Sequence, residues 1–492
     1  MEPQDNPVCS RADLVRIATQ EMIDRGLQPA FPAAVVRQVD TLTSADAEAD
    51  PQILDLSALP WCSIDNDDSL DLDQLSCCEA LAGGAVKVRV AVADVDALVH
   101  PGSAIDAHAQ FNTTSVYTSA KVFPMLPERL STDLTSLNPG QQRLALVTEM
   151  LIAEDAEILQ SSVYRARVRN QAKLAYDAVA AWIEGQGPLP PAAAAVPGMD
   201  EQLRVQDAVA QRLRERRQAQ GSLEFQSFQP RALFDGDRVV DIRQQVQNRA
   251  RQLIEELMIA TNSCTARFLA GSGRPSLRRV VRSPERWLRI VEVARKYGEA
   301  LPKAPDAQAL EAFLARRRAA DPLRFADLSL VIIKLMGSGE YVLEQPGAPA
   351  LGHFGLAVRD YTHSTAPNRR YPDLITSRLV KAILSAAPPP YNARELETLA
   401  EHCTQQENAA QKVERRVRKS EAALVLQTHL GQSFDAIVTG HSVTDSWVRI
   451  FAPPAEGKLV NAAPDTEVGQ QLRVKLVATD VERGFIDFAA VD

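Results

Sequence analysis

Apolar residues recur at helical spacing near the start of the chain. A helix there would be capped by Ser10 and Asp13 and ended by Gly26, and a second helix is expected after Pro32. The apolar face of the first helix comprises Leu14, Ile17, Ala18 and Met22. The two helices predict a small helical module over residues 1–48, and a helix-turn-helix is one arrangement open to it.

Apolar and polar residues alternate with a period of two further along the chain, which predicts strands over 86–92, 144–152 and 163–169. In the last of these, three arginines would line one face that phosphate groups could reach. The stretch 185–198 is rich in Pro and Ala and is expected to be a surface loop. Helical spacing returns in three longer segments, 246–269, 371–386 and 395–428.

The final segment, residues 429–492, changes character. Short β-rich runs are separated by Gly, Pro and Asp, as in small barrels. The runs are 434–438, 447–451, 472–478 and 485–489. Five short strands over such a length would form an OB-fold β-barrel. The fold class is therefore expected to be α+β, with a mixed α/β domain over residues 49–428 between the helical module and the barrel.

Length and composition limit the class of protein. A chain of 492 residues with 45% hydrophobic content has room for about three folded units. Its apolar runs fall short of the roughly 20 residues that cross a membrane, and the opening residues resemble no secretory signal. The six cysteines form no Cys-x-x-Cys pair, which argues against a zinc site. These features predict a cytoplasmic protein without membrane partners.

The balance of charge does not by itself favour a nucleic-acid partner. The formal net charge is −9, whereas neutralising phosphates requires Lys and Arg. The distribution of charge matters more than its sum, however. Arginines gather in five short segments, 165–169, 212–217, 243–251, 278–289 and 415–418. Solvated faces and phosphate-binding surfaces are both open to these segments.

An acidic turn is the clearest chemical feature of the sequence. Residues 64–74 read Ile-Asp-Asn-Asp-Asp-Ser-Leu-Asp-Leu-Asp-Gln. An EF-hand is excluded, because its central glycine and distal glutamate are missing. Mg²⁺ needs only a few carboxylates and takes its other ligands from water and substrate phosphate. The turn is therefore either a magnesium site or an exposed acidic loop.

An ordered set of motifs resembles the RNase II and RNase R family of exoribonucleases. Asp65, followed after five residues by Asp71-Leu72-Asp73, is similar to the catalytic signature of that family. Further similar motifs are 90–95, 114–117, 123–127, 130–131, 136–139, 253–258, 353–356 and 361–374. The resemblance covers roughly residues 60–430. It implies an RNB-type catalytic domain, followed by an RNA-binding OB fold.

The resemblance implies a magnesium-dependent, processive 3′-to-5′ exoribonuclease, for which Mn²⁺ would be a substitute ion. Such an enzyme hydrolyses single-stranded RNA without sequence preference to nucleoside 5′-monophosphates. Asp65, Asp71, Asp73 and Arg369 would be catalytic. The three aspartates and Gln74 would hold the metal. A monomer without an organic cofactor is the plain expectation.

The same resemblance implies the residues that bind RNA. Tyr117 and Phe225 would stack on bases, which reads no sequence. Tyr176 would contact the RNA backbone, and Glu256 or its neighbour Glu255 a ribose hydroxyl, by which RNA differs from DNA. Phosphates would be gripped by the guanidinium groups of Arg369 and Arg370. The resemblance places Glu414 near the 3′ end of the bound RNA.

One departure from the family pattern bears on catalysis. The family usually has an aspartate where this chain has Gln74, and an amide oxygen can coordinate Mg²⁺ but carries no charge. Asp67 or Asp68 in the same turn would then supply the charge, or the metal would be held more weakly. The alternative is a catalytically silent RNA-binding paralogue. Asn368 also stands where the family often has an apolar residue.

Overall fold

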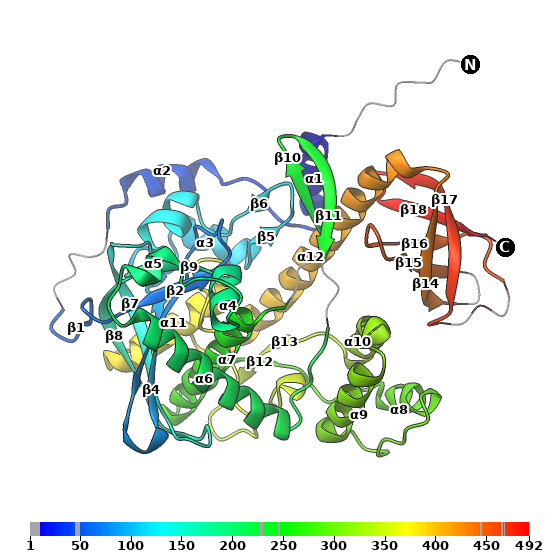
Figure 1. The fold of residues 1–492 in the computed structure, drawn as a ribbon. Coiled ribbons are helices and arrows are strands. Elements are labelled where there is room, and N and C mark those ends of the chain that lie inside the picture. The colour runs from blue at the N-terminus through cyan, green and yellow to red at the C-terminus, as the bar shows by residue number, and fades with distance from the viewer. Residues whose placement is uncertain are drawn as a thin grey trace.

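The computed structural model describes residues 10–44, 50–226, 230–244, 247–442, 445–463, 466 and 468–491. A large body is built around a seven-stranded sheet, and one long helix, α12 (Ala393–Leu426), runs from this body to a five-stranded barrel (Figure 1). The α+β fold class predicted from the sequence is confirmed.

The central sheet is mixed. Its strands lie in the order β1-β8-β7-β4-β3-β2-β9, with parallel pairs at the two edges, β1 with β8 and β2 with β9. The bounds are β1 Leu54–Asp55, β8 Ile158–Arg169, β7 Gln142–Ile152, β4 Val86–Ala93, β3 Gln74–Ala80, β2 Cys62–Asp65 and β9 Ala172–Ala175. The alternation predicted for 86–92 holds along β4. Val88 and Val90 pack into one core, and Ala91 and Ala93 pack into another.

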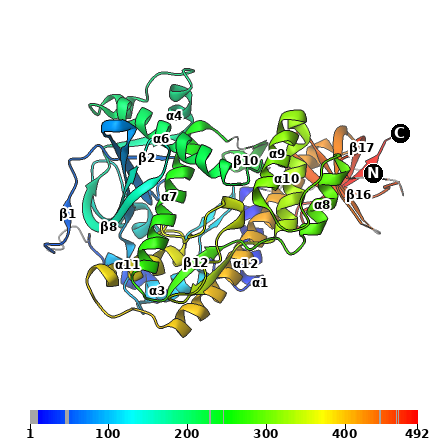
Figure 2. The ribbon, with the colours of Figure 1, turned by 90° about the horizontal axis from the view of Figure 1, so that it is seen from below.

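Helices cover both faces of this sheet. One core lies between the sheet and α4 (Tyr176–Ile183), α6 (Met199–Ala219) and α7 (Arg249–Gly271). The other core is closed by α2 (Ala33–Thr41), α3 (Ala104–Asn112) and α11 (Tyr371–Leu384). Figure 2 shows α7 and α11 from below, where both lie against the sheet. Because both faces are covered, the ends of the strands are where polar side chains can gather.

The helices near the start of the chain form where the sequence predicts them. α1 spans Arg11–Asp24, Ser10 and Asp13 make the predicted capping box, and the predicted apolar face is buried. α1 packs on α12, whereas α2 packs on α3. The two helices therefore lie on different parts of the larger body. The proposed module boundary at residue 48 stays a prediction.

The barrel at the end of the chain confirms the predicted OB-type fold. Its strands are β14 (Ser433–His441), β15 (Ser446–Ile450), β16 (Ala455–Leu459), β17 (Gln471–Asp480) and β18 (Phe485–Ala490), closed in the order β14-β15-β16-β18-β17. Its core shares one buried cluster with Leu424 and Leu426, at the end of α12. The long helix thus fixes the barrel to the body.

The remaining elements are short hairpins and a helical group. The paired strands are β5 (Val116–Tyr117) with β6 (Val122–Phe123), β10 (Pro230–Asp235) with β11 (Arg238–Gln244), and β12 (Ser276–Val280) with β13 (Glu340–Glu344). The helical group is α8 (Trp287–Lys296), α9 (Ala307–Ala320) and α10 (Pro322–Met336).

Two local expectations need correction. The segment 185–198 is not loop throughout, because Pro191–Ala194 form the short helix α5, with proline at its first turn. The arginine face of β8 is not open to phosphates along its length, since Arg165 is mostly buried and pairs with Asp50 and Asp94.

The cysteines within the described residues form no disulfide bond. Four of the five described cysteines are buried, and all five are free thiols. Cys9 lies outside the described residues. Among the described helices, none is both long and apolar enough to span a bilayer.

Gly457 in β16 offers a test of the barrel packing. A methyl group there would lie 2.5 Å from the carbonyl oxygen of Ile486 and 2.6 Å from the ring of Phe488. We expect Gly457→Ala to lower the free energy of unfolding by about 1–3 kcal/mol, because the backbone of β18 must move. Gly271→Ala is the control, since nothing lies within 4 Å of its added methyl group. Equal urea midpoints for the two variants would contradict the packing.

Candidate active site

The acidic turn connects two neighbouring strands of the central sheet. β2 ends at Asp65 and β3 begins at Gln74. The second half of the turn is anchored by Ser136, whose hydroxyl accepts from the amide of Leu72 at 3.0 Å and donates to the carbonyl of Leu70 at 2.7 Å. With Leu72 buried, Asp71 and Asp73 are held in fixed places on either side of it.

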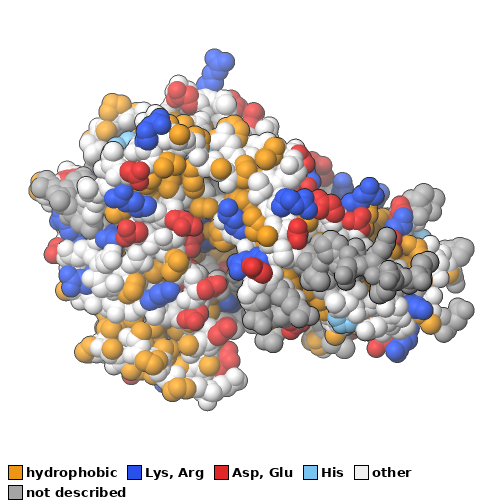
Figure 3. Space-filling model, turned by 90° about the horizontal axis from the view of Figure 1, so that it is seen from above, with side chains coloured by type: hydrophobic (Ala, Val, Ile, Leu, Met, Phe, Trp, Pro, Cys, Tyr) orange, Lys and Arg blue, Asp and Glu red, His pale blue; other side chains and the backbone are white. Residues whose placement is uncertain are grey.

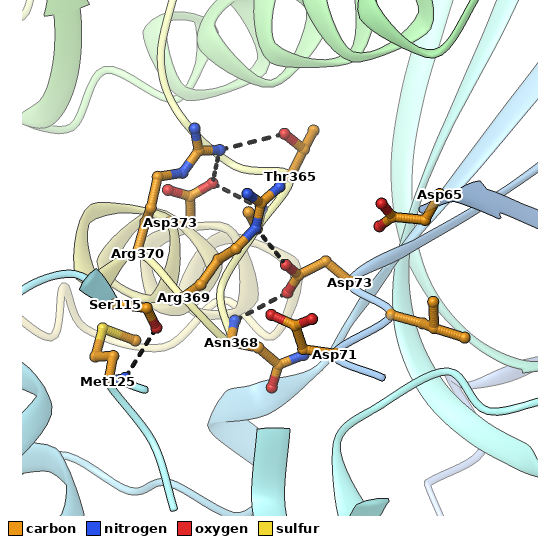
Figure 4. Close-up of polar contacts among 12 residues, drawn as sticks. Asp65, Asp71, Asp73, Ser115, Met125, Thr365, Asn368, Arg369, Arg370 and Asp373 are labelled. Atoms are coloured by element: carbon orange, nitrogen blue, oxygen red, sulfur yellow. Dashed lines mark hydrogen bonds and ion pairs between the residues drawn. The ribbon is translucent and has the colours of Figure 1, made fainter. Parts of the chain in front are cut away.

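Asp73 is the most enclosed carboxylate of the turn, at 2% exposure. It accepts from the backbone N–H of Asn368 at 3.0 Å and from Nε of Arg369 at 3.0 Å. Burial raises the pKa of Asp73 to about 7, and the negative charge of Asp71 adds to this rise, although the Arg369 guanidinium opposes it. The sequence-predicted pair of Asp73 and Arg369 is therefore in direct contact (Figure 4).

Polar contacts within the protein hold the loop that carries Arg369. The side chain of Asn368 is 1% exposed and accepts from the Thr135 hydroxyl at 2.5 Å. Arg370 donates to Asp373 at 2.7 Å, and the same carboxylate oxygen accepts from the amide of Ala366. Thus Arg370, predicted to bind RNA, has an internal partner, whereas the side chain of Arg369 is 42% exposed.

Asp71 contacts Tyr117, which in turn contacts Glu414, and both are predicted RNA-binding residues. The hydroxyl of Tyr117 donates to Asp71 at 3.1 Å, and the backbone N–H of Tyr117 donates to Glu414 on α12 at 3.0 Å. Burial raises the pKa of both carboxyl groups. Tyr117 is 40% exposed, so part of its ring is open to a ligand. The structure brings together residues that lie almost 300 positions apart in the chain.

Asp65 and Tyr176 lie at the end of the parallel pair β2 and β9. Asp65 is paired in register with Ala175, the residue before Tyr176, and Figure 4 shows its side chain pointing toward the gap beside Asp73. Burial raises the pKa of the Tyr176 hydroxyl, and the charge of Asp65 contributes to this rise. The two residues thus face a common space.

Arg251 on α7 is a residue that the sequence analysis did not select. Its guanidinium lies 4.4 Å from the ring centroid of Tyr176 and donates to the side-chain oxygen of Asn66 at 2.8 Å. It therefore ties α7 to the acidic turn next to Asp65. The arginine cluster 243–251 was the signal that could have pointed to it.

A cavity of about 780 Å³ continues from Arg251 to the helical group. Phe225, Glu255 and Glu256 line it. Glu256 is buried and receives both N–H groups of the Arg217 fork, at 2.9 and 2.5 Å, whereas Glu255 is exposed. The structure thus favours Glu255 of the two glutamates as the residue that a ligand can reach.

Phe225 packs partly against the apolar core of the helical group. Within the described part of the chain, Phe225 and Tyr117 form no aromatic pair. A base clamp made by these two rings stays a prediction.

The side chains near the acidic turn could supply only some of the ligands that a divalent cation takes. No group of three or more His, Cys, Asp or Glu side chains in the described ranges is arranged to hold a metal ion by itself. A ligand cage of Asp65, Asp71 and Asp73 is therefore not assembled. Gln74 is half-buried and makes no side-chain hydrogen bond to any described residue. The set fits Mg²⁺ that keeps water and substrate phosphate as further ligands, as that ion usually does.

The outer surface carries charges of both signs. Figure 3 shows acidic and basic side chains interspersed on one face of the molecule, without a broad area of one sign. This agrees with the net charge of −9. On this face, no broad basic area is available to a polyanion.

Two family models match the chain. The RNB domain model matches residues 53–386, and the RNase II-type exonuclease C-terminal S1 domain model matches residues 432–491. The first match spans more than half of the chain, so the chain belongs to the RNB-domain family. The resemblance drawn from the sequence motifs is thereby confirmed.

The chain is similar to curated ribonucleases R. Ribonuclease R of Vibrio cholerae serotype O1 is 30% identical over 505 residues, which cover 94% of this chain and 60% of that protein. Ribonuclease R of Escherichia coli strain K12 is 31% identical over 435 residues, which cover 85% of this chain and 52% of that protein. The chain thus spans little more than half of the length of these relatives.

Solved structures show the same fold at lower identity. The apo form of Mycoplasma genitalium RNase R has a TM-score of 0.88 at 22% identity, covering 97% of this chain and 78% of that one. The same protein in complex with ribose methylated single-stranded RNA has a TM-score of 0.89. Yeast Ssd1, a pseudonuclease, has a TM-score of 0.69 at 18% identity, covering 89% of this chain and 54% of that one.

The energetic link between Asp73 and Arg369 can be measured by a double-mutant cycle. We expect Asp73→Asn and Arg369→Met to show a coupling free energy of about 1–3 kcal/mol in urea unfolding, because the single change at Arg369 leaves a buried carboxylate short of a partner. The control is the exposed pair Arg16–Glu482, whose coupling should stay below about 1 kcal/mol. Equal coupling in the two pairs would contradict a special role for the first.

Proposed function

We propose that this chain is a processive 3′-to-5′ exoribonuclease that hydrolyses single-stranded RNA to nucleoside 5′-monophosphates with Mg²⁺. The observation that supports it best is the contact between buried Asp73 and half-exposed Arg369, with Asp71 and Tyr117 beside them. Carboxylates next to a guanidinium group suit a phosphodiester, since the arginine binds the phosphate and the carboxylates hold a cation. The ribonuclease R relatives support the same activity.

Arg369 and the carboxylates would divide the work at the scissile phosphate. Arg369 uses Nε for Asp73, so its remaining N–H groups would donate to a phosphate oxygen. Asp65, Asp71, Asp73 and the amide oxygen of Gln74 would hold the cation. Bound Mg²⁺ would neutralise phosphate charge and lower the pKa of the attacking water. Asp73 would also orient Arg369, because it accepts a hydrogen bond from Nε of that residue.

The RNA would lie between Tyr117 and the cavity beside α7. The exposed part of the Tyr117 ring would stack on a base. Glu414 would fix the position of that ring by accepting a hydrogen bond from the backbone amide of Tyr117. Tyr176 would contact the RNA backbone. In the cavity, Glu255 would accept from a ribose hydroxyl. Base stacking without base-edge contacts explains the expected indifference to sequence.

A catalytically silent RNA-binding protein is the second candidate. Two observations favour it: Gln74 stands where a charged ligand is expected, and the fold is also similar to yeast Ssd1, a pseudonuclease. Asp67 and Asp68 are both exposed in the turn, so supplying the missing charge would require them to reach inward. The enzyme is preferred because the Asp73–Arg369 contact is retained.

The activity test uses the full chain and single-stranded RNA that is labelled at its internal phosphates, with DNA of the same sequence as a second substrate. We expect release of nucleoside 5′-monophosphates from RNA with Mg²⁺ or Mn²⁺, and none with EDTA. Asp73→Asn should lower kcat by about 100-fold, because it removes a cation ligand and the carboxylate that orients Arg369. Asp67→Asn, on the exposed part of the turn, should leave kcat close to wild type. No mononucleotide with any divalent ion would establish the silent alternative.

The role of Gln74 has its own test. We expect Gln74→Asp to tighten Mg²⁺ binding by about tenfold or more, because a charged ligand replaces a neutral one next to Asp73. Titration of activity against Mg²⁺ concentration measures this, with Gln74→Asn as the neutral control. An unchanged Mg²⁺ dependence in Gln74→Asp would mean that another residue already supplies the charge.

Several narrower features belong to the same proposal. We expect a monomer in the cytoplasm, without an organic cofactor. The catalytic domain would span residues 49–428 and the RNA-binding barrel residues 429–492. The two family matches lie within these ranges.

A further inference from the structure

A second cavity lies apart from the acidic turn, between the hairpin β12–β13 and the segment that follows it. Its volume is about 270 Å³. The charged residues that line it are Arg278, Arg279, Arg359 and Glu344. Apolar side chains, among them Val280, Leu343 and Pro349, make up much of the remaining wall. Ligand pockets commonly measure about 300–1,000 Å³, and this one lies just below that range, so only a small ligand suits it.

The guanidinium group of Arg278 has fewer hydrogen-bond partners than it has N–H groups. Its side chain is 5% exposed, and it forms an ion pair with Glu344 and donates to the carbonyl of Ala266 at 2.8 Å. Its Nε and Nη1 are buried and have no hydrogen-bond partner among the described residues. Buried guanidinium N–H groups without acceptors are costly, and most such groups in proteins have a partner. A bound acceptor would supply one.

The charges around Arg278 do not fully compensate its burial. Burial lowers the pKa of Arg278 below its usual value, even though the negative charges of Glu344 and Asp360 oppose this change. Arg279 is matched by Glu407, which contacts both terminal nitrogens, at 2.5 and 3.1 Å. The cavity can therefore take a further negative group.

Arg359 provides a second donor at the cavity. Its side chain is exposed and makes no hydrogen bond or ion pair with any other residue that the structure describes. Arg278 also lines the cavity, so two guanidinium groups give it the positive charge that suits a phosphate or carboxylate. The carboxylate of Glu344 also lines the cavity, but it is engaged by Arg278.

The cavity is close to the loop that carries Arg369. Tyr361 lines the cavity, and its hydroxyl accepts from Asn262 at 3.3 Å. Asn262 in turn accepts from the amide of Ser364 at 2.9 Å. A chain of direct contacts thus runs from the cavity wall to the segment leading to Arg369.

We propose that this cavity binds a nucleoside 5′-monophosphate, with the phosphate on Arg278 and Arg359 and the apolar part of the nucleoside against Val280, Leu343 and Pro349. The choice of a nucleotide rests on the proposed function, since this is the product that the enzyme would release. The cavity is then a second site for product, separate from the acidic turn.

The test is calorimetric titration of the full chain with uridine 5′-monophosphate in EDTA, so that neither hydrolysis nor a metal is needed. We expect Arg359→Gln to weaken binding at least about tenfold, as for a lost charge-assisted hydrogen bond. Ala350→Trp, at the half-exposed cavity wall, should abolish binding by filling the space. Arg282→Gln is the matched control. Arg282 follows β12 in the chain and is 55% exposed, but it does not line the cavity.

Two further probes separate the parts of the ligand. Inorganic phosphate and uridine should each bind more weakly than the nucleotide, since each meets only one part of the wall. No binding of uridine 5′-monophosphate at millimolar concentration, or equal affinity in wild type, Arg359→Gln and Ala350→Trp, would overturn the site. Nucleotide binding that depends on Arg359 in a protein without ribonuclease activity would support the cavity and refute the proposed function. Ribonuclease activity without nucleotide binding in this cavity would support the proposed function and refute the cavity as a site.

Discussion

The ion pair between Asp73 and Arg369 is the constraint on which the candidate site depends. The two residues lie 296 positions apart in the chain, and Asp73 is almost fully enclosed where they meet. A carboxylate in that position is unfavourable unless it has donors, and the guanidinium of Arg369 and the amide of Asn368 provide them. The turn and the distant loop therefore stabilise one another.

The surrounding fold serves to keep these two segments in place. Ser136 fixes the acidic turn from one side, and Thr135, its neighbour in sequence, fixes Asn368 on the other. The long helix α12 then adds Glu414, which holds the amide of Tyr117. As a result, the Tyr117 hydroxyl donates a hydrogen bond to Asp71. Residues from five separate parts of the chain form one polar site because each of them has a partner inside the protein.

The elements that could be predicted from the sequence are those whose signals lie within a short stretch of the chain. The capping box at Ser10, the buried face of α1, the length of α12 and the barrel strands all follow from spacing and turn residues. The candidate aspartates and Arg369 came from a motif resemblance. Their contact was implied by that resemblance, but no periodicity could have given its geometry.

Other features of the site depend on tertiary contacts and could not be predicted. Arg370 looked equivalent to Arg369 in sequence, yet it is engaged by Asp373. Glu256 is enclosed by Arg217, so the exposed neighbour Glu255 is better placed for a ligand. Arg251 joins Tyr176 to the acidic turn through a ring contact that no spacing rule reports.

The central claim is that the acidic turn gathers a divalent cation against an RNA phosphate that Arg369 holds. Its most direct test is a crystal structure of the chain with Mn²⁺ and an RNA that resists hydrolysis, with the ion located by anomalous scattering. We expect a manganese peak coordinated by Asp71 or Asp65 and by a phosphate oxygen that also contacts Arg369. RNA bound in the crystal with no peak there, or with its phosphates away from Arg369, would contradict it.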